Sequence, residues 1–325
     1  MKNKDKNSVV LLAYGETGPF ALKSLVELFN VKFIVTPPQD PNLFRRAEEL
    51  EVEKLAKKKR IKIVQTNDNK VIEELVRETK PDALVISAYN RILPKSLLDL
   101  TKCINVHHGD LPNWRGRANF NWAIIMGRDR VGLTIHDAAV ELDSGNIYKQ
   151  YIITILKKET IATLYAKANK LIEKNLGLTV KEVINGYKGR PQKGEATYVC
   201  TRLPGDGYID WSLSSIEIDR FIRGLIKPFP GAFTYFKGEK MNVWSSEIPK
   251  KPLKYIGRIQ GRIIRIHKGF GVEVLTGDSS IILKDVTYGG KDGRADEFIN
   301  TVMASLGFNA VEAYELLKAK LEGNK

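Results

Sequence analysis

Apolar and polar positions follow two alternating patterns along the first half of the chain. Short apolar runs, many of them β-branched, predict strands at residues 9–13, 33–36, 61–65, 83–87, 104–107, 132–136 and 148–155. Between them, apolar positions recur every three or four residues and predict helices at residues 19–29, 43–59, 71–79, 120–126 and 159–184. This alternation favours an α/β fold, a Rossmann-like and mostly parallel sheet with helices on both faces.

The pattern changes near residue 190. Residues 186–206 are rich in Gly, Pro and Lys and lack periodicity, which is typical of a linker, and one helix is predicted at 215–225. Beyond Pro228, short alternating stretches favour a small antiparallel, OB-like β-barrel, with strands at 233–236, 241–244, 257–266, 271–275 and 280–283 and a terminal helix at 310–321. We therefore expect an α/β domain at residues 1–190, a linker with a connecting helix at 191–227, and a barrel-like domain at 228–325.

The charge balance favours an anionic partner. Lys and Arg number 52 against 38 Asp and Glu, a formal net charge of +14, and such an excess attracts nucleotides, folates or the phosphate backbone of RNA. The sign of the charge does not choose among these ligands, and its spread along the chain weakens the case for one dedicated nucleic-acid stripe. A solvated, lysine-rich surface is the ordinary alternative.

Short motifs argue against a membrane span, a disulfide framework, a zinc site and a nicotinamide cofactor. The apolar run at residues 9–14 is too short for a signal peptide or a membrane span, so we expect a cytoplasmic protein without a membrane partner. Cys103 and Cys200 lie far apart, with no second Cys at metal-ligand spacing, so neither a disulfide framework nor a zinc site is expected. The turn Gly15-Glu-Thr-Gly18 lacks the full glycine spacing of a dinucleotide fold, which argues against a nicotinamide cofactor.

Candidate chemistry gathers where the fifth predicted strand ends, in residues 104–117. Asn105 and His107 stand two positions apart, so on a strand they share one face, and ligands of open α/β sheets bind at strand ends. A neutral imidazole accepts a proton and a side-chain amide donates to a developing oxyanion, which suits attack by an amine on a carbonyl. Asp143, in a loop, could orient the imidazole or stabilise its charge. Taken singly, these residues also fit a buried histidine, a turn donor and an Asx-turn residue.

The combination of motifs resembles the folate-dependent formyltransferases. Asn105-Val-His107, Leu111-Pro112, Arg115-Gly116 and Leu142-Asp143-Ser-Gly145 follow one another in the order and spacing of that family, and the likeness covers nearly the whole chain. The resemblance implies an enzyme, a folate-dependent N-formyltransferase that transfers a one-carbon group, with Asn105, His107 and Asp143 as catalytic residues. It also implies 10-formyltetrahydrofolate as the formyl donor, no metal, and a catalytic role for residues 1–190.

Within this family, several stretches are most similar to the sugar-nucleotide N-formyltransferases, including the formyltransferase half of the lipid A aminoarabinose enzyme. They are Tyr14, Arg115-Gly-Arg-Ala118 with Asn121-Trp122, Asp206-Gly-Tyr-Ile-Asp-Trp211, Pro228-Phe-Pro-Gly-Ala-Phe233 and Val243-Trp-Ser-Ser246. This similarity implies a nucleotide-linked amino sugar as the acceptor, a role in cell-surface polysaccharide biosynthesis, a homodimer by analogy, and no nucleic-acid partner.

Ligand contacts are expected from the resemblance and from side-chain chemistry. For the folate, the resemblance implies two loops, with contacts from Ala88, Tyr89, Arg91, Ile92, Leu93, Val140 and Asp143. For the acceptor, guanidinium groups suit phosphate and aromatic rings offer stacking faces, which gives Arg115, Arg117, Arg223, Tyr14 and Trp122. A solvated charge at Arg223 and a core position for Trp122 are the ordinary alternatives. His108 and Asp110 stand where the family usually has an apolar loop, and they could read the acceptor or be a surface His and a turn Asp.

Two other functions stay open at this point. Methionyl-tRNA formyltransferases share the Pro-Gly-Ala-Phe stretch and a C-terminal barrel, but they usually carry a basic, glycine-containing insertion after the second strand, where this chain reads Pro37-Pro-Gln-Asp-Pro-Asn-Leu-Phe44. A nucleic-acid-binding protein could grip single strands with the barrel through basic grooves and stacked aromatics, although the barrel stretches hold few clustered aromatics.

Overall fold

The computed structural model describes residues 6–38, 47–89, 91–308, 314–315 and 317–319. Most of the predicted terminal helix at 310–321 and of the loop at 37–44 lies outside these residues. The chain divides into two compact units. The N-terminal unit comprises Met1–Phe120, Asp129–Leu156 and Thr163–Thr201, and the C-terminal unit comprises Asn121–Arg128, Lys157–Ala162 and Arg202–Lys325. Among the described residues, no helix is both long enough and apolar enough to cross a membrane.

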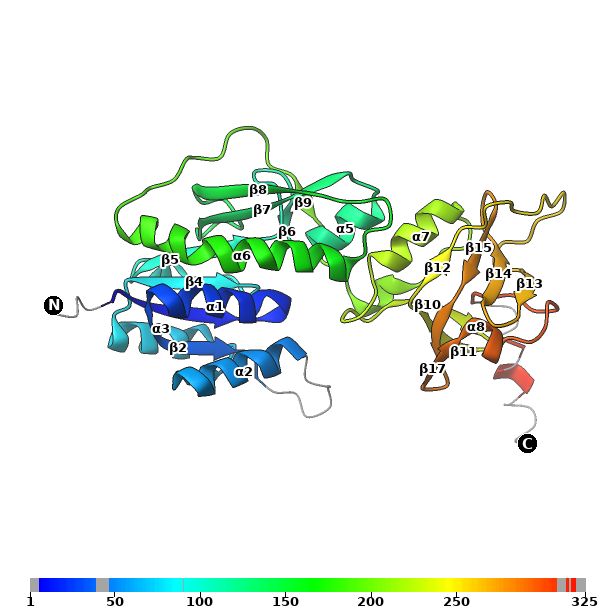
Figure 1. Ribbon diagram of the computed structural model, residues 1–325, viewed down its shortest axis with the longest axis horizontal. Coiled ribbons are helices and arrows are strands. Elements are labelled where there is room, and N and C mark those ends of the chain that lie inside the picture. Colours follow the sequence, from blue (N-terminus) through cyan, green and yellow to red (C-terminus); the bar gives the residue numbers. More distant parts are fainter. Residues whose placement is uncertain (1–5, 39–46, 90, 309–313, 316, 320–325) are drawn as a thin grey trace. The chain divides into compact units, whose positions relative to one another are not determined.

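A seven-stranded sheet in the order β3-β2-β1-β4-β5-β7-β8 forms the centre of the N-terminal unit (Figure 1). Its strands are β1 (Ser8–Ala13), β2 (Asn30–Thr36), β3 (Lys62–Gln65), β4 (Ala83–Ser87), β5 (Lys102–His107), β7 (Arg130–Asp137) and β8 (Ile147–Thr154). β1 to β5 pair in parallel, whereas β7 pairs antiparallel with both β5 and β8. The mostly parallel sheet predicted from the apolar runs is therefore confirmed.

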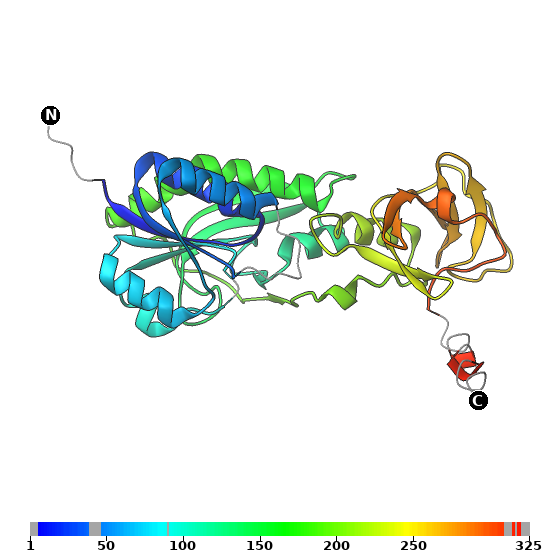
Figure 2. The same ribbon diagram turned by 90° about the horizontal axis from the view of Figure 1, so that it is seen from below.

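Helices cover both faces of this sheet. α1 (Gly18–Leu28) and α6 (Ile161–Ile184) lie on one face, and α3 (Asn69–Thr79) lies on the other (Figure 2). The Ser24 hydroxyl accepts a hydrogen bond from the backbone N–H of Gly177, which joins α1 to α6 directly. The other helical elements of the first half are η1 (Gly15–Thr17), α2 (Ala47–Lys59), α4 (Lys95–Leu98) and α5 (Asn119–Ile125).

Local sequence explains where these elements begin and end. The side chains of β1 are almost entirely buried, as expected for a strand covered on both faces. α1 has a proline in its first turn, where the missing N–H costs no helical hydrogen bond. The Asp68 carboxylate caps α3 by accepting from the backbone N–H of Lys70 at 2.9 Å. Because β1, β4 and β5 run in parallel, their carboxyl ends meet at one edge of the sheet, and the loops at this edge carry the candidate site.

The C-terminal unit contains two four-stranded antiparallel sheets, in the orders β10-β11-β16-β17 and β12-β15-β14-β13. Their strands are β10 (Ala232–Phe236), β11 (Glu239–Val243), β12 (Ser246–Glu247), β13 (Ile263–His267), β14 (Gly271–Leu275), β15 (Ser280–Leu283), β16 (Asp285–Tyr288) and β17 (Lys291–Arg294). This unit also contains η2 (Pro204–Gly207), α7 (Ser215–Arg223), α8 (Ala295–Phe298) and most of α5. The predicted antiparallel C-terminal fold is confirmed. β12, β16 and β17 were not predicted, because β12 has two residues, β16 alternates over only four, and β17 is polar throughout.

The aperiodic stretch at 186–206 is not free of structure. Its strand β9 (Tyr198–Val199) pairs in parallel with β6 (Arg115–Gly116), the short strand that follows the candidate catalytic motif. Arg190 also exchanges two backbone hydrogen bonds with Ile147 in β8. Residues 190–199 of this stretch therefore lie against the loops that carry the candidate site.

Candidate active site

Two neighbouring strands bring the first polar side chains together. Asn105 and His107 project from β5, and in the antiparallel pairing of β5 with β7 Asn105 stands opposite His136. The Asn105 side-chain nitrogen lies 3.1 Å from Nε2 of His136. Nδ1 of His136 lies 2.7 Å from the backbone oxygen of Asp137, so this ring nitrogen donates there.

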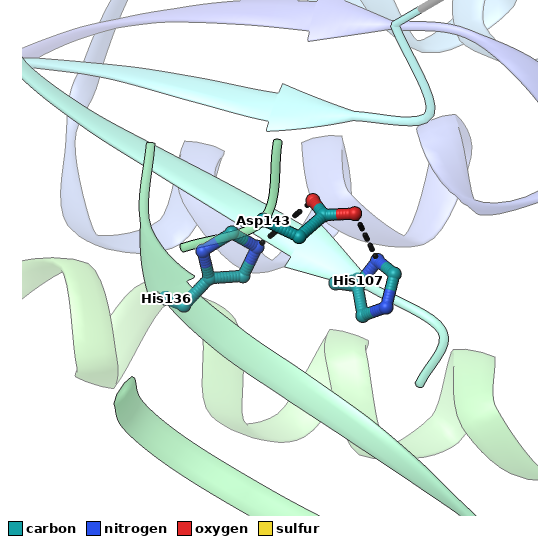
Figure 3. Close-up of side chains that lie close together, drawn as sticks. All are labelled: His107, His136 and Asp143. Carbon is teal, nitrogen blue, oxygen red and sulfur yellow. Dashed lines mark ion pairs between the residues drawn. The ribbon is translucent and has the colours of Figure 1, made fainter. Parts of the chain in front are cut away.

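Asp143 lies between the two imidazoles (Figure 3). Its Oδ2 atom is 3.4 Å from Nδ1 of His107, and its Oδ1 atom is 3.5 Å from Nε2 of His136. Oδ1 also accepts from the Asn105 amide at 3.4 Å, and Oδ2 accepts from the backbone N–H of Gly116 at 2.9 Å. The structure thus brings all three predicted catalytic residues into one hydrogen-bonded cluster.

The environment shifts the pKa values of both partners. Burial alone raises the pKa of Asp143, but its hydrogen bonds and the two histidines outweigh burial and hold this pKa at about 2. Burial lowers the pKa of His107, and the Asp143 charge opposes this effect only in part. At neutral pH the cluster therefore holds a carboxylate beside a neutral imidazole, which can take up a proton.

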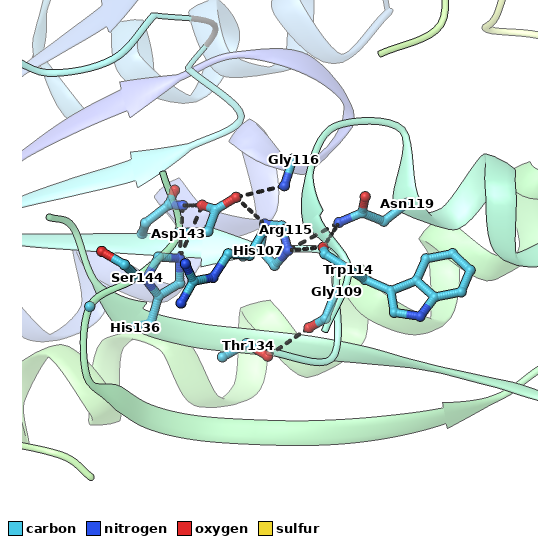
Figure 4. A network of polar contacts seen from close by, with 12 residues as sticks. His107, Gly109, Trp114, Arg115, Gly116, Asn119, Thr134, His136, Asp143 and Ser144 are labelled. Carbon is cyan, nitrogen blue, oxygen red and sulfur yellow. Dashed lines mark hydrogen bonds and ion pairs between the residues drawn. The ribbon is translucent and has the colours of Figure 1, made fainter. Parts of the chain in front are cut away.

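The second nitrogen of His107 has two different partners (Figure 4). Nε2 lies 2.8 Å from the backbone oxygen of Trp114 and 3.0 Å from the side-chain nitrogen of Asn119. The Asn119 amide can donate to the neutral ring, whereas the Trp114 carbonyl can accept from the protonated ring. Asn119 also donates to that carbonyl at 2.7 Å, which holds the three groups together. Both protonation states of His107 therefore find partners, as an acid–base residue requires.

The cluster also has the composition of a possible cation site. Ligand atoms of His107, His136 and Asp143 all lie within 4.8 Å of one another. Each of these atoms has a hydrogen-bond or ion-pair partner among the described residues. The geometry is explained by these hydrogen bonds, and no cation is needed to account for it.

The described residues of the two loops predicted to hold the folate include left-handed backbone at Ala88 and exposed apolar side chains. Ala88 has a φ of 60°, and a side chain added at Gly15 would meet its Cβ at 3.5 Å. The Tyr89 hydroxyl donates to Asn69 at 2.7 Å. Arg91, Ile92 and Val140 are exposed, whereas Leu93 is buried in the core. The exposed apolar side chains of Ile92 and Val140 suit contact with a flat heteroaromatic ring.

The predicted acceptor contacts of the N-terminal unit differ in how available they are. Tyr14 is buried and donates its hydroxyl to the Thr66 carbonyl, so its ring is not a free stacking surface. Arg115 is also buried, whereas Arg117 is exposed. His108 and Asp110 each have a buried side-chain atom, Nε2 and Oδ1 respectively, without a hydrogen-bond partner among the described residues.

Trp122 and Arg223 belong to the C-terminal unit, where both have structural contacts. The Arg202 guanidinium lies over the Trp122 ring, 4.9 Å from its centroid. Arg223 forms an ion pair with Asp219 at 2.7 Å and donates to the Glu159 carbonyl. These contacts account for both side chains without a ligand.

Three residues of the cluster were missed in the sequence. His136 was assigned only to a strand, but a histidine after the apolar run Val131-Gly-Leu-Thr-Ile135 was a visible signal. Asn119 lies between the two quoted parts of the motif at residues 115–122 but was not singled out, and Gln192, which contacts the Asp143 loop, stands in a segment without a motif. Their roles depend on contacts between distant parts of the chain, which local patterns do not reveal.

Two family models match the chain. The model described as Formyl transferase matches residues 22–180, and the model described as Formyl transferase, C-terminal domain, matches residues 204–302. The chain belongs to the formyl transferase family. The predicted enzyme class, a folate-dependent N-formyltransferase with 10-formyltetrahydrofolate as its formyl donor, is thereby confirmed.

The chain is similar to proteins with several different names. The methionyl-tRNA formyltransferase of Clostridium tetani is 33% identical over 297 residues, which cover 87% of this chain and 92% of the relative. The bifunctional polymyxin resistance protein ArnA of Wigglesworthia glossinidia brevipalpis is 33% identical over 264 residues, 77% of this chain but 39% of the relative. The crystal structure of HypX from Aquifex aeolicus in complex with tetrahydrofolic acid matches with a TM-score of 0.62 at 16% identity, over 90% of this chain and 47% of that one, and therefore shares the fold.

The predicted acceptor is wrong. Methionyl-tRNA formyltransferases from several bacteria are 30 to 36% identical to this chain over most of its length, whereas ArnA matches over a minor part of its own length. The amino-sugar partner, the role in polysaccharide biosynthesis and the exclusion of a nucleic-acid partner are therefore withdrawn.

The physical reason for this error lies in the stretches that favoured a sugar. Trp211, Phe233 and Val243 are buried side chains of the C-terminal unit, and the Asp206 carboxylate accepts from the backbone N–H of Leu203 at 2.7 Å. Side chains with such structural tasks do not discriminate between acceptors. The lack of a basic insertion at residues 37–44 was the argument against a tRNA acceptor, and most of these residues lie outside the described part of the chain.

Proposed function

We propose that the protein transfers the formyl group of 10-formyltetrahydrofolate to the amine of methionine carried by initiator tRNA. The observation that carries the chemistry is the contact of Asp143 with both His107 and Asn105 at the end of β5. The acceptor is proposed from the methionyl-tRNA formyltransferases that the chain resembles. A net charge of +14 also suits a polyanionic acceptor.

In this proposal, His107 moves the proton and Asp143 stabilises the charged ring. The amine nitrogen bonds to the formyl carbon, and the bond from that carbon to the folate nitrogen breaks. Neutral His107 accepts the proton that the amine loses and returns it to the departing folate nitrogen, so the enzyme ends in its starting state. Asp143 remains a carboxylate throughout, as its low pKa favours.

Asn105 would stabilise the oxyanion that forms on the formyl oxygen. Its amide nitrogen lies 3.1 Å from Nε2 of His136 and 3.4 Å from Oδ1 of Asp143, and it carries two N–H donors. The longer contact is the weaker one, and in this proposal a rotation of the amide directs one donor to the formyl oxygen. The proposed division of the chain assigns this chemistry to residues 1–190, and a tRNA acceptor would place the reaction in the cytoplasm.

A discontinuous formylation assay tests the proposal. The enzyme is given 10-formyltetrahydrofolate and methionyl initiator tRNA, with deacylated tRNA as the control that lacks the amine and nucleotide-linked amino sugars as competing acceptors. We expect product on the charged tRNA, and a loss on the order of a hundredfold or more in Asn105→Ala, since removal of one oxyanion donor has this effect.

A matched variant, Asn185→Ala, removes an exposed amide at the end of α6 and should leave the rate unchanged. Product on another amine only, or on no acceptor, would refute the tRNA proposal. An unchanged rate in Asn105→Ala would remove Asn105 from the mechanism.

A further inference from the structure

The segment from Arg190 to Val199 is attached to the loops around the catalytic cluster. The Thr197 carbonyl accepts from the backbone N–H of Arg115 at 2.8 Å, and its hydroxyl accepts from the backbone N–H of Trp114 at 3.0 Å. Trp114 is the residue whose carbonyl contacts His107. The segment therefore helps to fix the loop that borders the catalytic histidine.

Gln192 is the residue of this segment with the most direct link to the cluster. Its amide nitrogen donates to the backbone oxygen of Asp143 at 2.7 Å and to that of Gly145 at 2.9 Å. Its amide oxygen accepts from a terminal nitrogen of Arg115 at 2.9 Å. Both donors and the acceptor of one side chain are thus used, and all three partners belong to the surroundings of His107.

The Asp143 loop needs such support because its backbone is strained and tightly folded. Asp143 has a φ of 50°, in the left-handed region that non-glycine residues rarely adopt. A side chain at Gly145 would lie 2.0 Å from the backbone oxygen of Asp137, so the loop turns back closely on β7. A strained conformation persists only where its surroundings hold it, and Gln192 binds the loop on both sides of Ser144.

Arg115 is the second group that Gln192 holds. Its side chain is buried, and Nε has no hydrogen-bond partner among the described residues. The Tyr198 hydroxyl accepts from its other terminal nitrogen at 3.3 Å. A buried cation needs fixed partners, and Gln192 provides the shorter of these two hydrogen bonds.

We propose that Gln192 is a positioning residue that fixes the Asp143 carboxylate and the Arg115 cation around His107. The inference rests on the proposed catalytic roles of His107 and Asp143. It assigns an active-site task to a residue of the segment that the sequence pattern marked as a linker. Gln192 touches no reacting atom and acts through the two charges that it holds.

The charges around His107 give this role a measurable signature. Asp143 raises the pKa of His107, whereas His136 and, more weakly, Arg115 lower it. The neutral neighbour His108 adds no charge at neutral pH. When Gln192 no longer holds the loop, the loss of the Asp143 effect outweighs the loss of the Arg115 effect. The His107 pKa should therefore fall.

The test compares Gln192→Met, Gln192→Glu and the control Glu195→Gln in the full chain. Methionine keeps the length of the side chain without its hydrogen bonds. Glutamate keeps an acceptor for Arg115 but turns a carboxylate toward two backbone oxygens. Glu195 is exposed in the same segment. We expect kcat to fall about 10- to 100-fold in both Gln192 variants, as for displaced catalytic groups, with KM nearly unchanged and with wild-type behaviour in Glu195→Gln.

NMR titration of the histidines measures the His107 pKa, which should not change if Gln192 has a purely structural role. The chain has four histidines, so the His107 resonance can be assigned with His107→Ala. A lower His107 pKa in Gln192→Met, which adds no charge, supports the proposal. Unchanged kcat, or a reduced kcat with an unchanged His107 titration, would overturn it. If the wild-type enzyme formylates no tRNA, the proposed function fails, while the titration still decides the role of Gln192.

Discussion

Each unit of the molecule contains a histidine paired with a shielded carboxylate, and the two pairs differ in their surroundings. In the C-terminal unit, Nε2 of His267 lies 2.9 Å from Glu273, whose side chain is 2% exposed. In the N-terminal unit, His107 and Asp143 are 3.4 Å apart. The pair with the shorter distance belongs to the antiparallel hairpin of β13 and β14, where Glu273 also accepts from the Ser280 hydroxyl at 2.7 Å.

The surroundings of His107 are strained and incompletely paired. Trp114, Ala118 and Asp143 all adopt positive φ values. Among the described residues, four side chains between residues 108 and 119 keep a buried polar atom without a partner: His108, Asp110, Arg115 and Asn119. Strain and unsatisfied polar atoms concentrate at functional sites because folding alone does not favour them. A close histidine–carboxylate pair by itself therefore indicates a structural role. Strained backbone and unpaired buried polar atoms around the pair are what indicate a functional one.

The largest expected difference between the two pairs is in catalysis. His107→Ala should reduce kcat on the order of 100- to 10,000-fold, because it removes the proposed acid–base group. His267→Ala should leave kcat unchanged. It should instead lower the free energy of unfolding by about 1 to 3 kcal/mol, because Glu273 loses a hydrogen-bond partner while buried. Formylation kinetics and urea denaturation of both variants measure the two effects, and a comparable loss of kcat in His267→Ala would abolish the distinction.

Asp143→Asn should have the next largest effect, on both rate and pH dependence. Without the charge on Asp143, protonated His107 is less stable, and we expect kcat to fall roughly 10- to 100-fold.

The folded-state pKa of Asp143, about 2, lies below the ordinary 3.8. The unfolded chain therefore binds this proton more tightly, and the stability from Asp143 is complete above about pH 4 and is lost as the pH falls toward 2.

That contribution corresponds to about 2 kcal/mol when the shift is converted at roughly 1.4 kcal/mol per pKa unit. Denaturation curves between pH 6 and pH 3 should show a smaller decrease in Asp143→Asn than in the wild type. An identical decrease in both proteins would mean that the carboxylate is not stabilised by the cluster.

Much of the fold and part of the site could be predicted because their signals are local. Asn105 and His107 share a strand face through a spacing of two, and Asp143 was identified from a motif. His136 was missed because its importance comes from its pairing opposite Asn105, which depends on the β5–β7 register. Gln192 stands in a stretch without periodicity, and its partners lie far away along the chain. The acceptor prediction was wrong because the stretches on which it rested are largely structural.

The smallest expected effect concerns His108, which tests whether an unpaired atom near the site binds a substrate. Its ring packs against Phe120 and Tyr165, with centroids 4.8 and 5.2 Å away. Burial, with a smaller effect from His107, lowers the pKa of His108 to about 3. His108→Phe keeps the ring contacts and removes Nε2, so kcat/KM should stay close to the wild-type value.

Stability should reveal what activity does not in this variant. Because the folded-state pKa of His108 lies below 6.5, the unfolded wild type takes up the proton first, and the wild type loses stability as the pH falls from about 6.5 toward 3. His108→Phe lacks this titration. The difference between its free energy of unfolding and that of the wild type should therefore grow in favour of the variant in denaturation curves at pH 7, 6 and 5. A KM for the charged tRNA that rises tenfold would instead show that Nε2 of His108 contacts the acceptor, and the unpaired atom would then belong to the binding site rather than to the packing of the loop.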